Sequence, residues 1–232
     1  MIVFENAEVR RPDGSGIILE PVSLRLSESL ISIIGLNGSG KSTLARMMNG
    51  LVVPDTGRVL VLDPVSNAWL DTARKGSAVR RTVGFSFTDP AAQLIMPTVI
   101  EDIALSLRRE HKQKADRLAA ARTVLDRFGL ADLADRSVHQ LSGGQRQLVA
   151  LASVLATDPA VLVADEPTTL LDLRNTRMIG DLLCSLPQQT VIVTHNLELA
   201  ARAERTLVVH DGRIAFDGPP TEAIAHYREL AG

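Results

Sequence analysis

A glycine-rich segment, from Gly35 to Ser42, has the residue types and spacing of a loop that binds the phosphates of a nucleoside triphosphate. It fits G-x-x-x-x-G-K-[ST] at every fixed position and follows the apolar run 30–34. Such loops turn backbone N–H groups towards phosphate oxygens, and the lysine charge and a helix that begins near Lys41 attract the anion. The serine hydroxyl ligates Mg²⁺. The expected nucleotide contacts are Gly35, Asn37, Gly38, Ser39, Gly40, Lys41, Ser42 and Thr43.

The length, composition and charge of the chain exclude several classes of protein. Its 232 residues are 45% hydrophobic, enough for the core of a large α/β domain, and Lys+Arg 25 against Asp+Glu 27 leave a net charge of -2. Because there is no basic stripe, we expect no nucleic-acid partner. The first residues show no signal-peptide pattern, and no apolar run approaches the ~20 residues that span a bilayer. We therefore expect a cytosolic protein whose membrane role depends on a partner.

Two hydrophobic patterns alternate along the chain. Short apolar runs bounded by turn signals indicate strands, whereas apolar residues between about 98 and 157 repeat at helical spacing. We expect an α/β fold with a parallel core sheet, a small N-terminal antiparallel β subdomain and an inserted α-helical subdomain. The predicted strands are 2–9, 17–26 and 58–62, followed in the core by 30–34, 161–164, 190–194 and 206–210. We expect a single domain, 1–232, in which 1–87 and 158–232 form the core with the β subdomain and 88–157 the helical subdomain.

A second motif, Leu141-Ser142-Gly143-Gly144-Gln145, opens the second predicted helix of that insert. Ser142 can cap the helix, and the two glycines allow a close backbone approach. By itself the motif would indicate an ordinary helix start, but it lies between the phosphate loop and an acidic strand end at Asp165. From Val3 to about Gly218, this order of motifs resembles the ATP-binding-cassette (ABC) ATPases, which are P-loop NTPases. The resemblance implies ATP as the substrate, with its γ-phosphate contacted from the opposite subunit by Ser142, Gly143, Gly144 and Gln145.

The same resemblance assigns roles to residues that follow two buried strands. After the run 161–164, Asp165 is expected to ligate Mg²⁺ and Glu166 to polarise the attacking water. His195 resembles the histidine that contacts the γ-phosphate, and it lies at the edge where α/β sheets bind ligands. Asp172 resembles the aspartate that couples the two ATP sites of a dimer.

Three positions depart from the ABC pattern. Thr169 replaces a serine and keeps the hydroxyl, and Arg11 replaces the aromatic residue that stacks on adenine, so we expect its guanidinium plane to contact the base. Thr88 stands where the family has a glutamine that contacts Mg²⁺ and the attacking water. Gln93, a few residues later, is our first choice for that catalytic and metal-binding role, with Thr88 as the alternative.

Residues 89–104 resemble a run, D-P-x-x-Q-x-x-x-x-T-V-x-E-D-φ-A, of the energy-coupling-factor (ECF) importers for vitamins or transition-metal ions. In those importers a homodimer or a pair of ABC ATPases drives a transmembrane coupling (T) protein and a substrate-binding (S) membrane protein. The resemblance implies a peripheral location on the cytoplasmic face of the inner membrane. Thr88 together with 168–175 looks most like the biotin-type member, although cobalt- and nickel-type ATPases share most of the run.

Two other functions compete with transport. A soluble ABC ATPase that works on ribosomes or DNA usually has two cassettes in one chain or a long coiled-coil insertion, and this sequence has neither. A binding module without hydrolysis is opposed by the intact Lys41, Asp165 and Glu166. We therefore predict an ATPase, converting ATP and water to ADP and phosphate, that is coupled to transmembrane transport.

Overall fold

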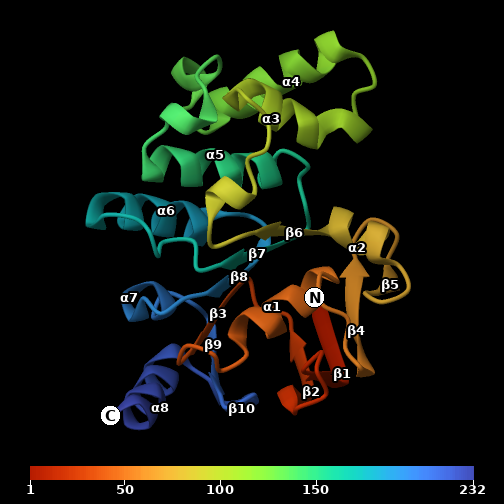
Figure 1. Ribbon diagram of the computed structural model, residues 1–232, viewed down its shortest axis with the longest axis vertical. Coiled ribbons are helices and arrows are strands. Elements are labelled where there is room, and N and C mark those ends of the chain that lie inside the picture. The colour runs from red at the N-terminus through yellow and green to blue at the C-terminus, as the bar shows by residue number, and fades with distance from the viewer.

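Two β-sheets with a helix between them make up the lower part of the computed structural model, which describes residues 1–232 (Figure 1). The larger sheet has the order β10-β9-β3-β8-β7-β6, and all its neighbouring strands are parallel except β9 and β10. Its strands are β3 (Leu30–Gly35), β6 (Val83–Ser86), β7 (Val161–Asp165), β8 (Gln189–Val193), β9 (Arg205–His210) and β10 (Arg213–Gly218). The smaller sheet, β2-β1-β4-β5, is antiparallel throughout. Its strands are β1 (Ile2–Arg10), β2 (Ile17–Leu26), β4 (Thr56–Asp63) and β5 (Ala68–Asp71).

The central strands of the larger sheet are apolar along almost their whole length. This is the pattern of strands that are covered on both faces, and β7 is buried at every residue. The parallel register places Asp165 beside Val193, and Gly35 beside Val209. Because parallel strands end at the same edge, the phosphate loop, the acidic pair and His195 all follow the carboxyl-terminal edge of this sheet.

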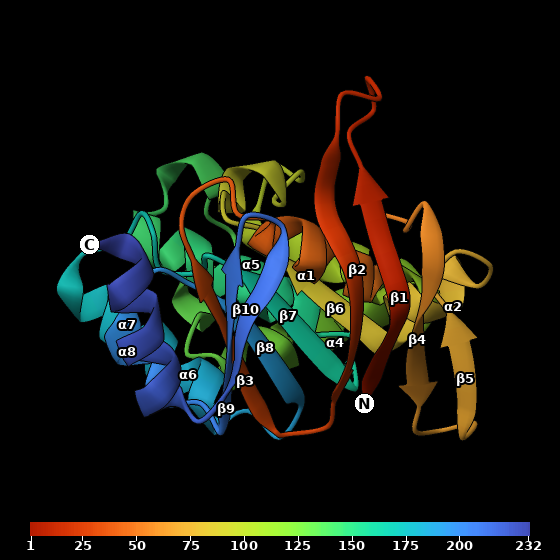
Figure 2. The ribbon, with the colours of Figure 1, turned by 90° about the horizontal axis from the view of Figure 1, so that it is seen from below.

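Helix α1 (Lys41–Asn49) lies between the two sheets (Figure 2). Its Leu44, Met47 and Met48 are fully buried in a cluster of 25 residues that also contains side chains from both sheets. This packing fixes the first residue of α1, and with it the end of the phosphate loop. Helix α2 (Gly76–Thr82) packs near the same cluster and leads into β6.

Helices on the other face of the larger sheet cover two smaller clusters. One contains Ile179 and Leu183 of α6 (Leu173–Ser185), packed with Leu162 and Ile192 of the sheet. The second contains side chains of α7 (Leu197–Ala200) and α8 (Pro220–Ala231), packed on Ile34 and Val208.

A helical region with its own core of 15 buried residues lies at the opposite end of the molecule from α8 (Figure 1). It contains α3 (Val99–Ser106), α4 (Lys114–Arg127) and α5 (Gly143–Leu155), and short 3-10 helices at Pro90–Ala92, Leu107–Arg109, Ala131–Leu133 and Val138–Gln140. The Ser142 motif therefore opens the third α-helix of the region, and the prediction that it opens the second is wrong. Helix α3 lies within the region predicted to be helical, but it was not distinguished there as a separate helix, since it has only eight residues and five of them are buried.

The predicted fold class is confirmed: the core sheet is mainly parallel, the N-terminal sheet is antiparallel, and helices are inserted between β6 and β7. Three strands of four to six residues, β5, β6 and β10, were not predicted from the sequence. None of the helices combines the length and the apolar character needed to cross a membrane.

Candidate nucleotide site

The phosphate loop connects β3 directly to α1. At Gly35 (φ 153°) a Cβ atom would lie 2.1 Å from the carbonyl oxygen of Val209, so only glycine allows β9 to pass this close. Gly38 and Gly40 also have positive φ, and their backbone N–H groups donate no hydrogen bond within the chain. Free N–H groups in front of a helix N-terminus form an anion-binding concavity.

The Lys41 ammonium group is folded into this loop. Its Nζ donates hydrogen bonds to the carbonyl oxygens of Gly35 (2.9 Å) and Leu36 (2.8 Å), and the residue is only 6% exposed. Burial lowers the pKa of Lys41, opposed by the negative charges of Glu166 and Asp165. The loop therefore holds a buried positive charge whose hydrogen bonds go only to uncharged carbonyl groups, and an anion would satisfy this charge better.

Ser42 and Asp165 meet beneath the loop. The Ser42 hydroxyl donates to Asp165 Oδ1 at 3.0 Å, while the buried Oδ2 of Asp165 accepts no hydrogen bond and lies 3.7 Å from the Arg46 guanidinium. Burial raises the pKa of Asp165. A hydroxyl and a carboxylate with one unused oxygen are the hard oxygen donors that Mg²⁺ prefers, so the residues present fit this ion.

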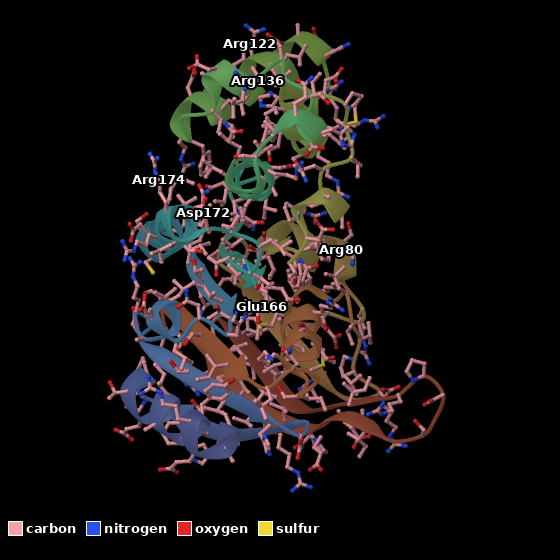
Figure 3. The ribbon with its side chains drawn as sticks, turned by 60° about the vertical axis from the view of Figure 1, so that its left-hand side comes forward. Arg80, Arg122, Arg136, Glu166, Asp172 and Arg174 are labelled. Atoms are coloured by element: carbon pink, nitrogen blue, oxygen red, sulfur yellow. The ribbon has the colours of Figure 1, made fainter.

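Glu166 follows β7 in an unusual backbone conformation. Its φ is +52°, and its N–H donates to the carbonyl of Val193, so the chain turns sharply out of the sheet. The carboxylate accepts hydrogen bonds from His195 Nδ1 (2.8 Å) and from the Thr169 hydroxyl (3.0 Å). Figure 3 shows Glu166 near the centre of the molecule. The structure thus brings together two of the three residues that are expected to act in catalysis, Glu166 and His195, which follow different strands.

Gln93, our first choice for contacting Mg²⁺, is engaged elsewhere. Its amide Nε2 donates to the carbonyl of Ala150 on α5 at 2.7 Å, and its Oε1 accepts from the N–H of Phe87 at 3.2 Å. Neither atom bonds Ser42 or Asp165, so in the ligand-free structure Gln93 joins the end of β6 to α5, and its role towards Mg²⁺ stays a prediction. Thr88, the alternative, lies two residues beyond β6, whose neighbour is the strand that carries Asp165.

A cavity of about 620 Å³ lies over the phosphate loop. Arg11 lines it, as expected of a residue that contacts the base, beside Ile17 and Ile18 at the start of β2. Asp211 and Gly212 also line the cavity, next to Ile18, and were not predicted from the sequence. Both residues have positive φ, and the N–H of Gly212 donates to the Ser39 carbonyl at 3.0 Å. An Asp-Gly pair between two apolar runs is the usual signal of this tight hairpin turn.

The Ser142 motif lies outside that cavity. Ser142 caps α5 in a reciprocal pair of hydrogen bonds with Gln145. A Cβ atom on Gly144 would lie 2.3 Å from Oδ1 of Asn175, so this glycine is needed for packing within the chain. Asp172 caps α6 and holds the same Asn175 amide at 3.0 Å. In Figure 3, Asp172 and Arg174 mark the start of α6, above Glu166.

Sequence comparison places this site in a known family. The family model for ABC transporters matches residues 19–169. The biotin transport ATP-binding protein BioM of Rhizobium etli is 48% identical, with 99% of each chain covered. The nickel import ATP-binding protein NikO of Rhodobacter capsulatus is 40% identical, with 84% of this chain and 80% of NikO covered.

Solved structures agree with the sequence comparison. CbiO1 of Clostridium perfringens, described as part of the ABC transporter complex CbiONQ, has a TM-score of 0.83 and 30% identity, with 99% of this chain and 92% of CbiO1 covered. The dimeric cassette MJ0796, bound to ADP and Pi, has a TM-score of 0.81 and 31% identity, with 95% of this chain and 99% of that chain covered. The chain therefore belongs to the ABC transporter family and is an ATP-hydrolysing cassette of that family.

Proposed function

We propose that this chain is the ATPase subunit of an ECF-type importer and that the imported vitamin is biotin. The observation that carries the proposal is the 48% identity to a biotin transport protein over 99% of both chains. The run 89–104 and the threonine at position 88 support the same subfamily. The protein would act at the cytoplasmic face of the inner membrane, bound to T and S membrane proteins.

The ATP site is proposed to be completed by a second cassette, either another copy or a related ATPase. Gly38, Gly40, Lys41 and Ser42 of one copy would hold the phosphates, and Ser142 and Gly144 of the other would close over them. Because the Ser142 motif does not reach the cavity of its own chain, it is free to serve a neighbouring one. A comparable cassette, MJ0796, is dimeric.

The polar residues that meet at the carboxyl-terminal edge of the larger sheet would then have separate roles in ATP hydrolysis. Ser42 and Asp165 would hold Mg²⁺, which when bound neutralises charge on the phosphates. Glu166 would orient the attacking water and accept its proton, and His195 would contact the γ-phosphate. Gln93, or Thr88 as the alternative, would take the role of the usual glutamine, and Arg11 would contact adenine.

The membrane partner is proposed to bind between α3 and α4. A cavity of about 230 Å³ lies there, and its lining combines apolar Met96, Leu105 and Leu118 with charged Glu101 and Arg108. The Gln93 hydrogen bonds tie the segment before this cavity to α5, whose first residues carry the Ser142 motif. Closure of two cassettes on ATP would therefore move the partner, driven by the higher affinity of ATP for the closed state.

The proposal is tested by uptake in cells that carry this chain with its membrane partners. We expect ATP-dependent accumulation of labelled biotin, which is lost with Lys41→Ala. A nickel importer is the second candidate, because NikO is 40% identical. Accumulation of radioactive nickel without biotin uptake, by the same cells, would establish the second candidate and reject the first.

A further inference from the structure

The Glu166 carboxylate is held through only one of its two oxygens. Oε2 accepts three hydrogen bonds, from the Thr169 hydroxyl (3.0 Å), His195 Nδ1 (2.8 Å) and the His195 backbone N–H (3.4 Å). Oε1 accepts no hydrogen bond within the chain. We propose that Thr169 is a positioning residue for ATP hydrolysis, which with His195 fixes Oε2 and so turns Oε1 towards the attacking water.

The chemistry of the two oxygens differs because of these contacts. A carboxylate oxygen that already accepts three donors has little capacity left for another proton. The free oxygen, by contrast, keeps its lone pairs available. An ionised carboxylate only accepts hydrogen bonds, so His195 must carry a hydrogen on Nδ1 in this arrangement. The side chain of Glu166 is only 14% exposed, which limits the competing contacts that solvent can make with it.

The two carboxylate oxygens of Glu166 have different roles in the proton-transfer step. The water oxygen forms a bond to the γ-phosphorus, and the bond from that phosphorus to the bridging oxygen of ADP breaks, with its electron pair staying on ADP. The water proton passes to Oε1 of Glu166, while Oε2 keeps its three donors. Products are ADP, phosphate and a protonated Glu166, which returns its proton to solvent before the next turnover.

The local backbone explains why Thr169 reaches back to Glu166. The N–H of Thr169 donates to the Glu166 carbonyl at 3.3 Å, which closes a turn and places the hydroxyl three residues later beside the carboxylate. A branched β-carbon restricts the χ1 rotation of threonine, so the hydroxyl is held in fewer orientations than on serine. Thr169 is itself exposed, so substitutions there leave the core packing unchanged.

The inference rests on the proposed role of Glu166, and the variants separate the two. Thr169→Val removes the hydroxyl at nearly constant shape. We expect it to lower kcat about tenfold, the usual effect of losing one hydrogen bond to a charged group, with KM for ATP unchanged. Thr169→Ser keeps the hydroxyl, so it should retain most of the wild-type kcat. Thr123→Val is the matched control, because Thr123 is also exposed but bonds only the Ala119 carbonyl within α4.

A double-mutant cycle with Glu166→Gln gives the decisive comparison. If Thr169 acts through the carboxylate, Thr169→Val should not lower the single-turnover rate further once Glu166 is replaced. An equal loss in both backgrounds, or a normal kcat for Thr169→Val alone, would overturn the positioning role while the role of Glu166 stands. Near-normal hydrolysis by Glu166→Gln would instead reject the role of Glu166, and the positioning role with it.

Discussion

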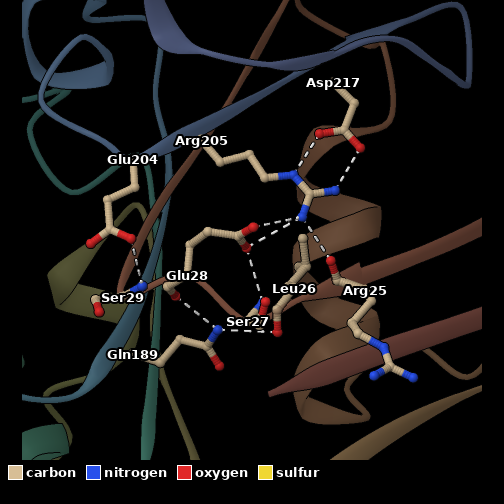
Figure 4. A network of polar contacts seen from close by, with 9 residues as sticks. All are labelled: Arg25, Leu26, Ser27, Glu28, Ser29, Gln189, Glu204, Arg205 and Asp217. Atoms are coloured by element: carbon tan, nitrogen blue, oxygen red, sulfur yellow. Dashed lines mark hydrogen bonds and ion pairs between the residues drawn. The ribbon is translucent and has the colours of Figure 1, made fainter.

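Both edges of the larger sheet carry buried or half-buried charges, but contacts within the chain stabilise these charges at only one edge. At the amino-terminal edge the Arg205 guanidinium donates to both oxygens of Asp217 at 2.6 Å, to Glu28 at 3.0 Å and to the Arg25 carbonyl at 2.8 Å (Figure 4). These contacts, first of all the hydrogen bond to Asp217, raise the pKa of Arg205. The fold therefore stabilises the charge.

At the carboxyl-terminal edge the charged side chains are not fully satisfied by contacts within the chain. Burial raises the pKa of Asp165 and lowers that of Lys41, so the ligand-free fold disfavours both charges. One oxygen of Asp165 and the hydroxyl of Ser39 are buried without a hydrogen bond. The difference teaches that one sheet can separate stability from function: one edge satisfies its charges within the chain, and the other leaves them for a ligand.

If the two edges differ in this way, the largest effect of a mutation should be on ATP hydrolysis, at the carboxyl-terminal edge. Glu166→Gln should reduce ATP hydrolysis by roughly 10²–10⁴-fold, because it removes the proton acceptor while retaining the shape of the side chain. ATP affinity and the free energy of unfolding should change little. Steady-state ATPase assays and size exclusion with ATP provide the measurement, and we expect a trapped dimer. Near-normal turnover would contradict the assignment.

Removing the Arg205 contacts at the amino-terminal edge should lower the stability of the fold without changing ATP binding. Arg205→Met removes the guanidinium of a side chain that is 21% exposed and leaves Asp217 and Glu28 without this partner, so we expect a loss of about 2 kcal/mol in the free energy of unfolding. ATP affinity should stay the same. Arg202→Met is the matched control: its pair with Asp181 is exposed (41% and 72%), and its loss should stay within about 0.5 kcal/mol. Equal losses in urea denaturation would show that the network around Arg205 is not special.

A smaller effect should appear in the pH dependence of the ligand-free protein. The folded pKa of Asp165 is raised above its usual 3.8, so the stability that its protonated form provides is complete below that value and is lost as pH rises through the folded pKa. Asp165→Asn cannot ionise. The stability of this variant relative to wild type should therefore grow as pH rises from about 4 and then level off above the folded pKa of Asp165. A difference that is constant with pH would contradict the burial of this charge.

Much of the fold follows from local patterns. The phosphate loop, the buried strands and the antiparallel N-terminal strands have strong short-range signals, and the capping role of Ser142 needs only its own helix. The short strand β6 was missed, because residues that are buried on both faces carry no period to detect, and α3 was not distinguished as a separate helix within the predicted helical region.

The site was harder to predict where contacts join distant segments. Gln93 and Thr88 are close in sequence, and only the fold shows that the Gln93 amide bonds Phe87 and Ala150. The sequence around Gly144 did not show that Asn175 of the same chain packs against this glycine, while its contact with ATP stays a prediction. The three donors that converge on one oxygen of Glu166 come from two loops whose distance the sequence does not specify.

The most direct test measures the free energy of unfolding of Asp165→Asn and Arg205→Met, with and without Mg²⁺ and ATP. In the ligand-free protein we expect Asp165→Asn to gain about 1 kcal/mol, a usual gain when a functional strain is removed, while Arg205→Met loses stability. ATP and Mg²⁺ at 100-fold above Kd should stabilise wild type and Arg205→Met equally, by about 2.7 kcal/mol, and Asp165→Asn much less. The opposite results would be that Asp165→Asn is destabilised without ligand, or that it gains as much from ATP and Mg²⁺ as wild type does. Either would contradict the claim that the charges at the carboxyl-terminal edge are unfavourable until a ligand binds them.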